Sequence, residues 1–244
     1  MASNLRSSQN QNLKESFIEE SLRAVSYISQ SNKYIRPFVN ESLPYFSAHS
    51  EIGKSAILAN LRLFNQVCEN VVASGESVLD SRVMLWHVLR LLDFIFPSDL
   101  FDYITSDHLV EVYDFNNIQI FRNLKFFDMT SYCLEELLCR PWIELFSRED
   151  QSQIAKITEI LSKMYSKEIT GVISLKEIGL NRIIETDSPF HIRADILIHF
   201  SAPILNKAKQ VVGYIAIESA ELLSSMPVGR EAERLLQAYY DLKK

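Results

Sequence analysis

The chain has 244 residues, of which 47% are hydrophobic and 23% are charged, as expected for a globular protein with a packed core. Its net charge of −6 at pH 7, without a run of basic residues, argues against nucleic acid as a partner, because phosphate binding needs clustered lysine and arginine. The longest apolar stretch, residues 89–96, is interrupted by charge and is too short for membrane insertion, and the polar first residues lack the apolar segment of a signal peptide. We expect a cytoplasmic protein.

The first hundred residues predict helices. Residues 1–10 are rich in Ser, Asn and Gln and are predicted to be a disordered tail. Residues 11–97 are predicted to form a bundle of three or four helices, because apolar side chains recur there at helical spacing, most clearly over 57–71. Gly75 is expected to follow a helix end with left-handed backbone, and Ser77 or Asp80 to start the next helix. The apolar stripes of this bundle indicate core rather than a cofactor site.

Strands are predicted from residue 98 onward. Residues 109–114 and 118–122 read as two strands joined by an asparagine turn, and residues 147–167 read as a helix. Three further strands are predicted at 179–185, 191–200 and 210–218. Residues 225–244 are predicted to be a C-terminal helix, which either docks onto the body or forms a dimeric coiled coil.

The last predicted strand is apolar on both faces, so both faces must be covered. The outer cover is the helical bundle, the C-terminal helix or a second subunit. We assign Val212 and Tyr214 of this strand, with Leu235 and Tyr239 of the C-terminal helix, to an interface with a protein partner or a second copy of the chain.

Residues 110–150 carry an ordered set of motifs. Asp114 and Asn117 flank the first turn, Asn123 ends the second strand, and Tyr132 precedes the run Leu-Glu-Glu-Leu-Leu. A Pro-Trp pair at 141–142 and a Glu-Asp pair at 149–150 follow. This order resembles the first half of a PAS sensory domain, and the resemblance extends over roughly residues 100–223. Ser131 and Cys139 stand where the family usually has glycine.

The resemblance implies an α+β protein: the helical bundle at 11–97, then a PAS-like domain at 98–224 with a five-stranded antiparallel sheet and flanking helices, and the C-terminal helix at 225–244. PAS domains bind small ligands between sheet and helices or mediate protein contacts. Trp142 stands where flavin-binding photosensory relatives have their reactive cysteine, and the helix at 147–167 has no histidine for haem, so we expect no cofactor.

A small apolar ligand is one interpretation of the inner side chains, and a self-filled core is the other. The predicted ligand-binding residues are Phe121, Asn123, Phe127, Trp142, Ile157, Leu161, Ile196 and Ile215. The three cysteines, Cys68, Cys133 and Cys139, are odd in number and lack CxxC spacing, so they are predicted to be buried thiols rather than a disulfide or zinc site.

Enzyme motifs are not found. The sequence contains no GxGxxG, P-loop, GxSxG or HExxH motif, and the adjacent carboxylates Glu135-Glu136 and Glu149-Asp150 are interpreted as solvated surface. We therefore predict a non-enzymatic sensory or regulatory module of a signal-transduction pathway, which acts by protein–protein contact and is gated by a small ligand. The alternative is a small-molecule-binding protein with an apolar pocket.

Overall fold

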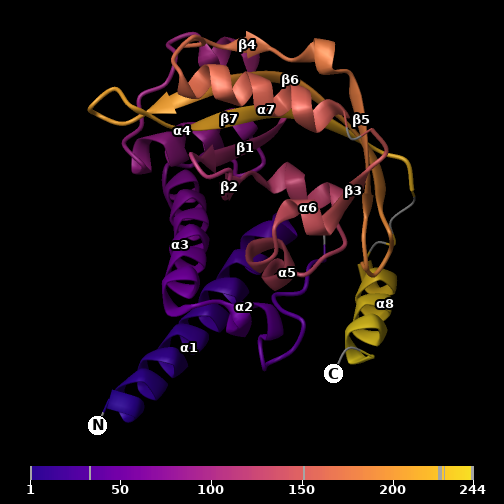
Figure 1. The fold of residues 1–244 in the computed structure, drawn as a ribbon. Coiled ribbons are helices and arrows are strands. Elements are labelled where there is room, and N and C mark those ends of the chain that lie inside the picture. The colour runs from indigo at the N-terminus through magenta and orange to yellow at the C-terminus, as the bar shows by residue number, and fades with distance from the viewer. Residues whose placement is uncertain (1, 33, 151, 225–226, 228, 243–244) are drawn as a thin grey trace.

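The computed structural model describes residues 2–32, 34–150, 152–224, 227 and 229–242. Long helices at the N-terminus lie beside a curled antiparallel sheet, and a further helix ends the chain (Figure 1). The predicted α+β class is confirmed. Residues 225–226, 228 and 243–244 of the predicted C-terminal helix, and residue 1 of the predicted tail, lie outside the described residues.

The N-terminal part consists mainly of helices. They are α1 (Ala2–Ile28), α2 (Pro44–Ala48), α3 (Glu51–Ala73) and α4 (Ser81–Leu91), with a short 3-10 turn, η1 (Ser29–Ser31), after α1. Since α1 begins at Ala2, the prediction of a disordered tail is wrong for residues 2–10. That stretch contains neither Pro nor Gly, so nothing in it stops the helix that Phe17 and Ala24 anchor in the core.

Two predicted helix boundaries are confirmed. Gly75 follows α3 with φ of 71°, in the left-handed region that glycine favours. Asp80 caps α4, because its Oδ1 accepts a hydrogen bond from the backbone N–H of Arg82 at 2.9 Å.

Within the described ranges, seven strands form one antiparallel sheet in the order β2-β1-β7-β6-β5-β3, with β4 paired to β6. The strands are β1 (Leu109–Asp114), β2 (Gln119–Arg122), β3 (Phe146–Arg148), β4 (Ile173–Ser174), β5 (Leu180–Glu185), β6 (Arg193–Leu205) and β7 (Val211–Leu222). The predicted sheet had five strands. It lacked β3 and β4, which have three and two residues and are too short to show an alternating pattern.

Short helices connect the strands. They are η2 (Leu100–Tyr103), η3 (Leu124–Met129), α5 (Leu134–Cys139), α6 (Trp142–Leu145), α7 (Ser152–Tyr165) and η4 (Lys176–Ile178), and α8 (Gly229–Asp241) follows the last strand. Helix α7 crosses one face of the long strands β6 and β7 in Figure 1.

The sheet is covered on both faces by its own chain. Val112 lies opposite both Phe121 and Ile215, and all three belong to the core cluster that includes the side chains of α3 and α4. The next residue along, Tyr113, lies opposite Tyr214 on the other face, where Tyr214 packs against Leu161 of α7. The helical bundle is therefore the outer cover of β7.

One hydrophobic cluster runs from Phe17 in α1 through the bundle to Ile217 in β7. The boundary predicted between residues 97 and 98 thus runs through a shared core. The sheet and the first four helices pack as one body, so side chains from both parts can line a common cavity.

Candidate ligand cavity

A cavity of about 640 Å³ lies beneath α7, on the sheet face that carries Tyr113 and Tyr214. The segment from α5 to α6 forms another wall, with side chains that include Leu138 and Trp142. Side chains of α3, among them Ile57, also reach it. This volume is in the range of sites that enclose small organic molecules.

Half of the predicted ligand-binding residues line this cavity. They are Trp142, Ile157, Leu161 and Ile196. Phe121, Phe127 and Ile215 do not line it. Phe121 and Phe127 lie 6.3 Å and 6.0 Å from Phe64 of α3 between ring centroids, and Ile215 shares the face of Phe121. Because side chains alternate along a strand, Ile215 lies on the opposite face of β7 from Tyr214, which lines the cavity.

Asn123 does not line the cavity either. Its side chain is buried, and its Nδ2 donates to Ser81 Oγ at 2.7 Å and to the His108 carbonyl at 2.9 Å. Its Oδ1 accepts from the backbone N–H of Val110 at 3.2 Å. These bonds join the end of β2 to β1 and to the start of α4, so the role of Asn123 is structural.

Charged side chains missed by the prediction line the cavity floor. Glu111 of β1 lies opposite Arg122 of β2, and both are buried. The carboxylate of Glu111 accepts hydrogen bonds from Tyr113 Oη at 2.8 Å and from the Gln119 amide. Burying a charge is expensive unless it is paired, and here the pairing comes from neighbouring strands.

A second acid and base line the same side of the cavity. Glu218 of β7 and Arg148 of β3 also line the cavity, and the Arg148 guanidinium lies 4.2 Å from the centroid of the Trp142 ring. Burial raises the pKa of Glu218 well above its ordinary value, the nearby Glu111 raises it further, and Arg148 opposes the rise. Burial likewise raises the pKa of Glu111, and Arg122 opposes it.

One sequence signal could have found these residues. Glu111 and Glu218 interrupt otherwise apolar strands, at positions that share a face with Tyr113 and Tyr214. An acid in a doubly covered strand has no route to solvent, so its burial follows once the cover of both faces is recognised.

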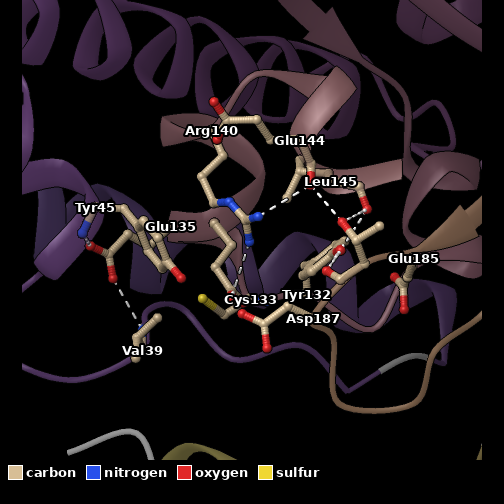
Figure 2. A network of polar contacts seen from close by, with 12 residues as sticks. Val39, Tyr45, Tyr132, Cys133, Glu135, Arg140, Glu144, Leu145, Glu185 and Asp187 are labelled. Atoms are coloured by element: carbon tan, nitrogen blue, oxygen red, sulfur yellow. Dashed lines mark hydrogen bonds and ion pairs between the residues drawn. The ribbon is translucent and has the colours of Figure 1, made fainter. Parts of the chain in front are cut away.

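Figure 2 shows a second polar network, around α5. Glu135 and Glu136 are fully buried, so their interpretation as solvated surface is wrong. The Glu135 carboxylate accepts three backbone hydrogen bonds, from Val39 at 3.1 Å, Tyr45 at 2.9 Å and Phe46 at 3.0 Å. It fixes α5 to the segment that enters α2.

Glu136 binds the C-terminal helix. Its Oε2 accepts from Tyr240 Oη at 2.6 Å and from the backbone N–H of Cys133 at 3.1 Å. Arg36 stacks over the Tyr240 ring, 5.0 Å from its centroid, and donates to Gln237 at 2.7 Å. Helix α8 therefore docks onto the body, which is one of the two predicted arrangements.

The predicted interface residues have different surroundings. Tyr214 lines the cavity and Val212 packs against the main core, so neither lies on a free outer sheet face as predicted. Tyr239 donates from its hydroxyl to the Asp187 carbonyl at 2.9 Å. Leu235 is 36% exposed, whereas the adjacent Leu236 is buried.

The motif residues of the PAS resemblance serve local structure. Tyr132 is buried and donates from its hydroxyl to the Leu145 carbonyl at 2.6 Å and also contacts the Thr186 carbonyl (Figure 2). Ser131 donates to the buried carboxylate of Glu185 from its backbone at 2.7 Å and from its hydroxyl at 2.5 Å. These bonds fix the start of α5 to β5.

All three cysteines are buried and free, as predicted, and burial raises the pKa of the Cys68 thiol to about 12. In the part of the chain that the structure describes, no group of three or more His, Cys, Asp or Glu is placed to hold a metal ion. No helix over the same residues is long and apolar enough to cross a membrane. No protein-family model matches the chain, and no curated protein is similar to it.

Proposed function

We propose that this protein is a non-enzymatic sensory or regulatory module of a signalling pathway, which binds a small molecule in the cavity and acts through a protein contact at its C-terminal helix. The observation that carries the proposal is that one short helix, α5, forms a wall of the cavity and also holds α8. Because the cavity adjoins the docking site of a terminal helix, a ligand in the cavity can change how that helix docks.

The order of elements supports a PAS-like module. Two strands, short helices, a longer helix and three long antiparallel strands follow one another from β1 to β7, as the resemblance implies. The cavity lies between the sheet and α7, and the resemblance implies a ligand between sheet and helices. β3 and β4 are additions to that pattern.

Helix α5 provides a direct route between the two sites. Leu137 and Cys139 line the cavity, while Cys133 and Glu136, less than two turns away, contact Tyr240 of α8. Because α5 has only six residues, a ligand that moves its cavity end also moves its α8 end. Packed elements of this kind move between discrete arrangements rather than deforming continuously.

Helix α8 offers the contact surface. Leu235 in this helix and Leu242 directly after it are 36% and 90% exposed, although both are apolar. A change in the docking of α8 would alter the presentation of these side chains to a protein partner or to a second copy of the chain.

Filling the cavity by mutation tests the proposal. In Ile157→Trp, the larger side chain occupies cavity space from α7, whereas Ala155→Trp places the same side chain on the exposed side of that helix. We expect amide hydrogen exchange in residues 229–241 to change in the first variant and to stay at the wild-type rate in the second. Equal exchange in all three proteins would contradict the coupling.

The second candidate is a small-molecule-binding protein that stores or presents its ligand without signalling. The size of the cavity favours it, because about 640 Å³ suffices for a ligand whether or not α8 responds. Ligand loss in Ile157→Trp combined with unchanged exchange in α8 would identify this second function.

A further inference from the structure

The cavity contains a buried acceptor without a donor. Asn181 of β5 is 2% exposed and lines the cavity. Among the described residues, none donates a hydrogen bond to its Oδ1. A buried carbonyl oxygen that lacks a donor is costly to the fold, and polar groups in native interiors are nearly always paired. A ligand with an N–H group at this end of the cavity would supply the missing donor.

Glu218 marks the other polar end. Its carboxyl makes no hydrogen bond to the residues described, although it is buried and lines the cavity. Its carboxyl oxygens line the cavity and can accept a hydrogen bond from a ligand. An amide group, which is uncharged and has an N–H donor, complements them.

The distance between these two ends sets the length of the ligand. Asn181 lies opposite Ile196 on β6, and Glu218 lies opposite Ile198 of the same strand. The two residues are thus on strands that flank β6, roughly 10 Å apart across the sheet at about 4.8 Å per strand and about 7 Å apart along it at about 3.4 Å per residue, which gives about 12 Å in all. Ile196 and Ile198 line the floor between them. A ligand that reaches both ends must be apolar in its middle.

The ionisable groups limit the charge of the ligand. The sheet side of the cavity has two acids, Glu111 and Glu218, and two guanidinium groups, Arg122 and Arg148. On the α5 side, Arg140 also lines the cavity, and its Nη1 lies 3.9 Å from Oε1 of Glu136. Arg122 is the favourable charge partner of Glu111, and Arg148 is that of Glu218. These acids and guanidinium groups already balance one another's charge. A ligand with a net charge would therefore add an unpaired buried charge, which is costly.

We infer that the ligand is an uncharged, elongated organic molecule with an apolar middle, an N–H donor at the Asn181 end and an amide-like group at the Glu218 end. This inference rests on the proposed ligand-binding function. It specifies the class of small molecule that the cavity takes.

Matched probes test the inference. Indole-3-acetamide, tryptamine and indole-3-acetate share one ring system and ring N–H but are neutral, cationic and anionic. Calorimetric titration into the purified chain, with melting temperature as a second readout, should show the amide binding at least about tenfold more tightly than either charged probe. A charged probe that binds as tightly would overturn the inference while leaving ligand binding in place.

The ring N–H is tested at Asn181. Asn181→Leu should weaken the binding of indole-3-acetamide about tenfold, because a buried hydrogen bond is lost. The same change should alter the binding of 1-naphthylacetamide, which lacks the ring N–H, less than about twofold. Removing the unpaired oxygen should also raise the melting temperature of the ligand-free variant. Equal weakening of both probes would overturn the assigned donor position. No binding by any probe to the wild type would overturn both this inference and the proposed function.

Discussion

The hydroxyl of Tyr240 donates a 2.6 Å hydrogen bond to Oε2 of Glu136, and both side chains are fully buried. They lie 104 positions apart, so this bond closes the end of the chain onto α5. The same hydroxyl accepts from the backbone N–H of Cys133 at 2.9 Å. The pair therefore joins α8 to the wall of the cavity.

Removing this hydroxyl should loosen α8. Tyr240→Phe leaves the Glu136 carboxylate and the Cys133 N–H without one partner each, and we expect a loss of about 1–3 kcal/mol in the free energy of unfolding. Amide exchange in residues 229–241 should accelerate. Tyr239→Phe is the matched control, because its hydroxyl bonds the Asp187 carbonyl at an exposed position. Equal effects of the two changes would contradict the assigned role of Tyr240.

The three backbone bonds to Glu135 predict a stability effect. Glu135→Leu has a similar volume but accepts no hydrogen bond, so the N–H groups of Val39, Tyr45 and Phe46 lose their acceptor. We expect a loss of about 3 kcal/mol or more, measured by urea unfolding. The control is Glu149→Leu, which replaces an exposed acid of the Glu149-Asp150 pair and should change the free energy of unfolding by less than about 0.5 kcal/mol.

Glu218 predicts how stability depends on pH. Its pKa is raised in the folded protein by burial and by Glu111, so the folded state binds this proton more tightly than the unfolded state. The contribution is fully present below the unfolded pKa and is lost as pH rises toward the folded pKa. Wild-type stability should therefore fall as pH rises above the ordinary pKa of a glutamate, relative to Glu218→Gln, which cannot ionise.

Urea unfolding of both proteins at several pH values measures this difference. A constant gap between wild type and Glu218→Gln at every pH above that pKa would show that the buried carboxyl does not titrate there.

Gly213 should tolerate no side chain. A Cβ at this position of β7 would collide with the backbone carbonyl of Tyr113 on the neighbouring strand, where neither backbone can move independently. We expect Gly213→Ala to destabilise the protein by about 2 kcal/mol or more in thermal unfolding. Gly171→Ala, whose added Cβ meets no atom within 4 Å, is the control and should leave stability nearly unchanged. Similar melting temperatures for the two variants would contradict the close approach.

The exposed apolar side chains of α8 predict an association surface. Leu235→Asp should abolish binding to a partner, or dimer formation in sizing experiments, without changing the melting temperature, because this side chain is not part of the buried face. Association that is retained in this variant would show that α8 is not the contact surface.

Sequence periodicity predicted most elements because their signals are local. β1 has its predicted bounds, and the apolar stripe at 57–71 lies within α3. The missing strands and the misjudged sheet face have different causes. β3 and β4 are too short to show alternation, whereas β7 is apolar on both faces, so alternation alone could not tell which side faces α7.

The candidate site was less predictable, because its key contacts join distant segments. Glu135 is buried by a segment some ninety positions earlier, and Glu136 by a helix some hundred positions later. Propensity and spacing carry no information about such partners. The charged floor of the cavity was missed for the same reason, since Arg148 reaches it from a three-residue strand.

Native mass spectrometry of the purified chain, read beside its denatured mass, tests the central claim most directly. The account predicts an excess mass on the native wild type that disappears on denaturation, persists in Ala155→Trp and is absent from Ile157→Trp. An identical, ligand-free mass for all three native proteins, together with no binding of the indole and naphthalene probes, would contradict the claim that this cavity is a ligand site.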